Sequence, residues 1–86
     1  MNEFEIGKIY LFTTVRMFVV GKVVSQSLFF VNLEDAIFCR DLGNFDTFLT
    51  TLKITRHQKL GRWRIALAAL QGASEELDEK VLSINK

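Results

Sequence analysis

The sequence contains no proline, one cysteine and one histidine among its 86 residues. A lone Cys39 cannot form an intramolecular disulfide, which argues against a small secreted scaffold held by disulfides. Cys39 and His57 are too few ligands for a structural zinc site within one chain, so we expect no metal and no cofactor. No apolar run is long enough to span a bilayer, and Glu3 and Glu5 stand where a signal peptide would carry basic residues. We therefore expect no membrane partner and a cytoplasmic location, in a bacterium or in the host cell of a virus.

Residues suited to acid, base or nucleophilic chemistry are also scarce. Cys39 lies in an apolar stretch typical of a buried small hydrophobe, and His57 stands among polar and basic residues typical of an exposed loop. Glu34 and Asp35 are adjacent, so on a strand they would face opposite ways, and a turn at the end of a strand explains them better than a carboxylate pair. The glycines are isolated and form no phosphate-binding loop. We therefore expect that the chain is not an enzyme.

Apolar residues are plentiful: they make up 49% of the chain, and eight of them are Phe. A domain of this size has one small core, which cannot easily hide so much apolar surface. Either both faces of its strands are covered, or the surplus is buried against other copies of the chain. The second outlet predicts a homo-oligomer.

Short runs of β-branched and aromatic residues, separated by polar turns, predict a chain built mainly of strands. Gly21 inside the second run marks a bulge, a bend or a close approach of another backbone. Asn44 can cap a short helix over residues 45–52, and a loop held down by the same apolar side chains is the alternative. Residues 62–70 alternate with a period of two and favour a strand, although a helical stripe over residues 62–84 is an alternative reading. The expected strands are residues 9–12, 17–24, 28–33, 36–39 and 62–70.

These elements predict a mainly β fold, a small and strongly bent five-stranded SH3-like barrel with one short helix. We place the barrel domain in residues 1–73. From residue 74 to residue 86 we expect a polar C-terminal tail, part of which is helical.

The runs at residues 19–24 and 31–36 also resemble the first signature of the Sm and Sm-like proteins, which include the bacterial RNA chaperone Hfq. That signature has an apolar strand with a glycine, here Gly21, and a later strand that ends near an acidic residue and alanine, here Asp35 and Ala36. The resemblance covers residues 8–36, with a weaker candidate for the closing strands at residues 62–70. It implies an Sm-like barrel whose edge strands pair between neighbours in a ring.

The uridine pocket of the Sm family does not carry over to this chain. The turn at residues 25–28 is about one residue short, and Phe30 stands where the family has an asparagine. Residues 65–70 lack the Arg-Gly pair of the second Sm signature. The chain also resembles a group of small uncharacterised bacterial and phage proteins through the run at residues 33–36 followed by Asp41, Gly43 and Phe45.

Basic residues gather where the sequence has no acid, between residues 53 and 64. Basic side chains can neutralise phosphates, so we expect this segment to bind single-stranded RNA. On a strand Trp63 would face away from Arg62 and Arg64, which favours a core position for the tryptophan. The expected nucleic-acid-binding residues are Lys53, Arg56, His57, Lys59, Arg62 and Arg64.

Two functions are compatible with these patterns. The first is a ring-forming Sm-like homo-oligomer that binds single-stranded RNA through a basic face. The second is a structural or adaptor barrel whose partner is another protein or a small ligand, without nucleic acid; the Phe-rich strands and the missing uridine pocket favour it.

Overall fold

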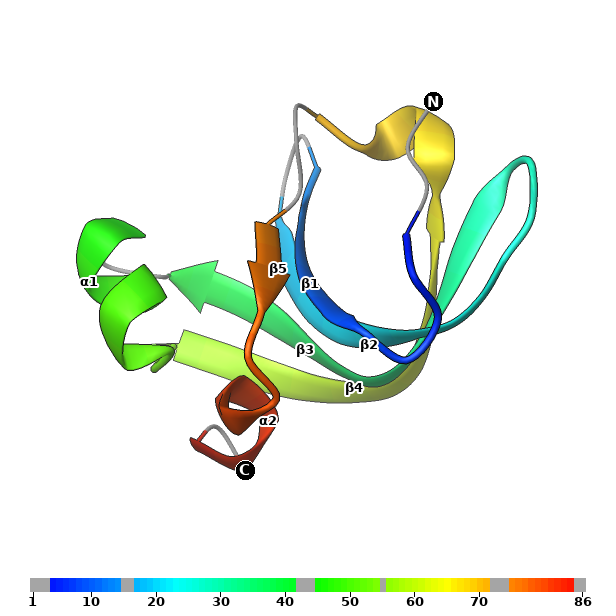
Figure 1. The fold of residues 1–86 in the computed structure, drawn as a ribbon. Coiled ribbons are helices and arrows are strands. Elements are labelled where there is room, and N and C mark those ends of the chain that lie inside the picture. The colour runs from blue at the N-terminus through cyan, green and yellow to red at the C-terminus, as the bar shows by residue number, and fades with distance from the viewer. Residues whose placement is uncertain (1–3, 15–16, 42–44, 55, 72–74, 85–86) are drawn as a thin grey trace.

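Five antiparallel strands form a single, strongly curved sheet in the order β4-β3-β2-β1-β5 (Figure 1). The computed structural model describes residues 4–14, 17–41, 45–54, 56–71 and 75–84. The mainly β class and the five strands are confirmed, but these described residues form two short α-helices rather than one. The elements are β1 (Ile9–Thr13), β2 (Phe18–Gln26), β3 (Phe30–Asp41), α1 (Phe45–Thr51), β4 (Arg56–Ala66), the 3-10 turn η1 (Leu67–Ala69), β5 (Glu75–Leu77) and α2 (Lys80–Ile84).

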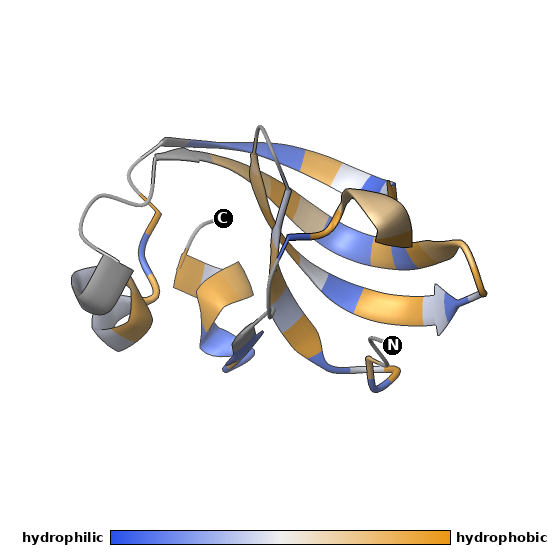
Figure 2. Cartoon of the chain, turned by 90° about the horizontal axis from the view of Figure 1, so that it is seen from above, coloured by the Kyte–Doolittle hydropathy of each residue, from blue (hydrophilic) through white to orange (hydrophobic). Residues whose placement is uncertain are grey.

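Both faces of the sheet are covered, so the chain has two hydrophobic cores. One face carries Ile9, Leu11 and Val20 and lies under Phe48 of α1 and Val81 of α2; we call it the helix face. The opposite face packs under Phe4, Met17 and the chain around η1 and is called the turn face; its buried residues are Tyr10, Phe12, Val19, Val23, Val31, Leu33, Ala36 and Ile65. Covering both faces of the sheet is the first of the two ways in which the chain was expected to bury its many apolar side chains. Figure 2 shows the apolar stretches along the strands, interrupted by polar residues.

β3 is one long strand where the sequence predicted two short ones. Residues 28–33 and 36–39 were expected to be separate because Glu34 and Asp35 resemble a turn. Instead the strand runs on through a bulge at Asp35, whose φ is 51°, and the pairing with β4 shifts at this point. A bulge accommodates the extra residue without ending the strand.

β4 begins earlier and ends sooner than predicted. The strand was expected over residues 62–70, with His57 in a loop, but it starts at Arg56 and ends at Ala66. Gly61, with φ of 70°, supplies the second bulge that lets the basic segment continue the strand. Residues 67–69 are rich in alanine, which has little preference for strands, and they form a 3-10 turn.

Gly21 lies at a bend and a close approach between strands, as a glycine in mid-strand predicts. A Cβ atom at this position would lie 2.9 Å from Cδ1 and 3.1 Å from Cβ of Leu33. The pairing of β2 with β3 also shifts between Val20 and Lys22. The glycine therefore allows β3 to approach closely where the sheet bends.

The described part of the C-terminal segment, beyond the expected boundary at residue 73, packs against the sheet. β5 pairs with β1, with Leu77 opposite Ile9, and Val81 is completely buried in the helix-face core. The backbone N–H of Lys80 donates to Oδ1 of Asp78, 2.9 Å away, at the start of α2. A strand of three residues and a helix of five are too short for their periodicity to be detected in the sequence, although the expectation of some helix in this segment is confirmed.

The helix predicted at residues 45–52 is confirmed as α1, with Phe48 buried. Its predicted cap, Asn44, and Gly43 of the second resemblance lie outside the described residues. Within the described part of the chain, neither helix has the length and apolar character needed to cross a membrane.

Candidate nucleic-acid interface

Most of the predicted basic residues lie on β4, which is an edge strand of the sheet. His57 pairs with Cys39 and Lys59 pairs with Ile37. Residues directly opposite each other on paired strands point to the same side of a sheet. Since Cys39 and Ile37 belong to the helix-face core, His57 and Lys59 lie on the helix face as well.

The bulge at Gly61 brings two arginines onto that face. Gly61 pairs with Ala36 and Trp63 with Leu33, and both partners are buried on the turn face. Arg62 and Arg64 alternate with these positions and therefore share the helix face with His57 and Lys59. Without the bulge, residues 57 and 59 would point away from residues 62 and 64. We call His57, Lys59, Arg62 and Arg64 the β4 basic row.

Trp63 points away from the two arginines, as predicted, but it is not a core residue. Its side chain is 39% exposed and lies at the open edge of the sheet beyond Leu33. The expected burial required a neighbour on the outer side of β4, and none of the other described strands occupies that position.

Arg64 is held in place by its neighbours on β3 and β2. Its Nε donates to Oδ1 of Asn32 at 2.8 Å, and Nδ2 of Asn32 donates to Oγ of Ser25 at 2.9 Å. The guanidinium carbon also lies 5.2 Å from the centre of the Phe30 ring. A guanidinium fixed in this way loses less conformational freedom when it binds a phosphate or stacks on a base.

The other two predicted residues are not part of this row. Lys53 lies in the connection between α1 and β4 and is exposed, with its backbone N–H donating to Oγ1 of Thr51. The backbone of Arg56 pairs with Asp41 at the start of β4, and its side chain lies outside what the structure describes.

Sequence reasoning missed the partners that neighbouring strands contribute. Lys22 and Glu34 face each other across β2 and β3 on the helix face, so acidic and basic groups share the surface. Asn32 and Phe30 reach the row only through the register of β3 against β4. No local pattern identifies these contacts, because they depend on pairing between strands, and the segments that bring Asn32 and Phe30 to the row lie about 30 residues apart.

Metal ligands are not gathered anywhere in the described residues. No three His, Cys, Asp or Glu side chains there come close enough to hold a metal ion. Cys39 is buried, as predicted, and burial raises the pKa of its thiol from 9.0 to about 12, against a smaller opposing effect of the Val20 backbone. The thiol is therefore neutral and inert in the folded protein.

The raised pKa of Cys39 predicts a loss of stability in alkali. The unfolded thiol ionises above pH 9 and the folded one only near pH 12, so the contribution is complete below pH 9 and disappears between these values. From pH 8 to 10.5 the free energy of unfolding should fall by about 2 kcal/mol more in the wild type than in Cys39→Ala. Urea unfolding at the two pH values measures this difference, and parallel declines would contradict it.

No family model matches this chain, and neither a curated protein nor a solved structure resembles it closely enough to count as a match. The candidate interface is therefore defined by its own residues: four basic side chains in a row along one face of an edge strand.

Proposed function

We propose that this protein is a ring-forming homo-oligomer of the Sm-like type that binds single-stranded RNA through the β4 basic row. The observation that carries the proposal is the bulge at Gly61, which aligns His57, Lys59, Arg62 and Arg64 on one face. Clustered cations on one face are the usual electrostatic footprint of a nucleic-acid-binding domain.

The surroundings of the row favour a single strand over a duplex. The Phe30 ring is 39% exposed beside Arg64, and both groups offer flat surfaces on which an unpaired base can stack. Lys59 and Arg62 lie farther along the same strand and would neutralise successive phosphates. A duplex hides the faces of its bases and could use only the charges.

The unpaired edges of the sheet support self-assembly. β4, with 11 residues, and β5, with three, end the sheet on opposite sides and do not pair with each other. Exposed edges tend to pair with another chain, and two unlike edges give a head-to-tail contact that closes into a ring. Repeated around a ring, the basic row would become a multivalent surface.

The proposal predicts binding that depends steeply on salt. If Lys59, Arg62 and Arg64, the charged side chains of the row, each neutralise a phosphate, raising the salt from 50 to 300 mM should weaken binding to a labelled single-stranded oligonucleotide by about fortyfold. Fluorescence anisotropy measures the affinity, while light scattering with absorbance at 260 and 280 nm gives the mass and any bound nucleic acid. Salt-independent binding would reject the basic row as the binding surface, no binding at 50 mM would reject RNA binding, and a monomer would reject the ring.

The second candidate function is an adaptor that binds another protein. It is favoured by the turn between β2 and β3, where Leu28 is 80% and Phe29 71% exposed. Adjacent exposed apolar side chains commonly mark a protein contact. This candidate predicts no RNA retention at low salt, so the anisotropy experiment distinguishes the two functions.

A further inference from the structure

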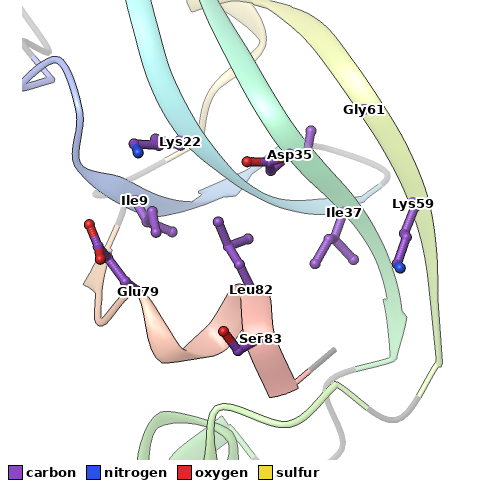
Figure 3. Close-up of a pocket in the computed structure, with 10 residues that line it drawn as sticks. Ile9, Lys22, Asp35, Ile37, Lys59, Gly61, Glu79, Leu82 and Ser83 are labelled. Carbon is purple, nitrogen blue, oxygen red and sulfur yellow. The ribbon is translucent and has the colours of Figure 1, made fainter. Parts of the chain in front are cut away.

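A cleft of about 360 Å³ opens on the helix face between the sheet and α2. Its volume lies in the range of small-molecule sites, about 300–1,000 Å³. Ile9 of β1, Ile37 of β3 and Leu82 of α2 form apolar walls, and Figure 3 shows Leu82 rising between the two isoleucines. Asp35 closes the end of the cleft opposite α2 (Figure 3).

Asp35 reaches the cleft because of the bulge in β3. Its neighbour Glu34 pairs with Lys22 on the helix face, and regular alternation would place Asp35 on the turn face. The positive φ of 51° turns Asp35 back to the helix face, where it lines the cleft. A non-glycine residue in this conformation is uncommon, and such positions concentrate at functional sites.

The cleft joins the β4 basic row through Lys59, which belongs to both. Lys22 and Lys59 stand on opposite sides of the cleft in Figure 3, with Asp35 between them. Glu79 and Ser83 border it on the α2 side. A ligand that fits here needs a flat apolar body, hydrogen-bond donors for Asp35 and an anionic group for a lysine.

We infer that this cleft holds a guanine base of the bound strand, an inference that rests on the proposed RNA-binding function. An ionised carboxylate only accepts hydrogen bonds and offers two oxygens side by side. Guanine presents two neighbouring donors, N1–H and the N2 amino group, which match those oxygens. Adenine and cytosine present an amino group beside a ring-nitrogen acceptor, and uracil presents one N–H between two carbonyls. The Asp35 carboxylate therefore selects guanine, and Lys22 or Lys59 contacts the adjoining phosphate.

The test compares hexauridine with the same strand carrying one guanosine, at 50 mM salt. The full chain should bind the guanosine strand about tenfold more tightly, as expected for a bidentate pair. Asp35→Asn should abolish this preference while affinity for hexauridine stays the same or rises, since asparagine tolerates the positive φ. The matched control is Glu34→Gln, which removes the adjacent carboxylate outside the cleft and should keep the preference. Thermal melts confirm that both variants fold.

The possible results separate the guanine site from the proposed RNA-binding function. Equal affinity for the two strands, or a preference that survives in Asp35→Asn, would overturn the guanine site while leaving RNA binding intact. If neither strand binds, the proposed function fails, and titration with guanosine monophosphate followed by NMR then decides the cleft alone. Amide shifts at Ile37, Leu82 and Ser83 with this nucleotide, but not with uridine monophosphate, would support the site, and their absence would overturn it.

Discussion

Arg62→Glu combined with Arg64→Glu is expected to weaken binding to a single-stranded oligonucleotide by at least about a hundredfold at 50 mM salt. The double variant removes two phosphate contacts and places two negative charges where the strand would lie. It also removes the guanidinium that donates to Asn32 and lies over Phe30. Fluorescence anisotropy with a labelled oligonucleotide measures the loss, and the salt dependence of the remaining binding should become shallower.

The control for this experiment makes the same charge change elsewhere. Lys8→Glu combined with Lys80→Glu alters two exposed lysines that belong neither to the β4 basic row nor to the cleft. Its binding should fall only a few-fold, through the change in net charge. Light scattering on both variants shows whether assembly is intact. Equal losses in the two variants would place the RNA elsewhere or reduce its binding to overall charge.

A chain that ends at residue 73 is expected to lose its cooperative fold. The deletion exposes the β5 side of β1 and removes Val81 and Leu82 from the helix-face core. A domain of this size is stable by only about 5–10 kcal/mol, and losing one covering layer of a core exceeds that margin. Circular dichroism during heating should show a sharp transition for the full chain and none for the shortened one.

Two point variants separate the packing of α2 from the loss of chain length. Val81→Ala should lower the free energy of unfolding by about 2 kcal/mol, because Val81 is completely buried. Ile84→Ala should change it by less than about 0.5 kcal/mol, because Ile84 is 45% exposed. A shortened chain that still melts sharply would restore the domain boundary at residue 73.

The fold could be predicted from the sequence where the pattern is local. β1 and β2 follow from runs of β-branched and aromatic residues and α1 from helically spaced apolar residues, and each lies close to its predicted position. The bulges at Asp35 and Gly61 could not be predicted, because a strand accepts an extra residue only when its partner is in place. β5 was missed for a related reason, since its three residues form a strand only by pairing with β1.

The candidate site was predicted only in part for the same reason. The opposite directions of Trp63 and the two arginines follow from alternation, and the register confirms them. The alignment of Lys59 with Arg64 contradicts simple alternation and depends on the bulge between them. Asn32 and Phe30 approach Arg64 only after β3 and β4 have paired.

The two cores are built on the same strands, so the stability of both depends on those strands. In β1, Ile9 and Leu11 serve one core while Tyr10 and Phe12 serve the other. Val19 and Val20 divide in the same way on β2. Losing either strand would expose both cores at once. The central strands are therefore expected to unfold together, as one cooperative unit.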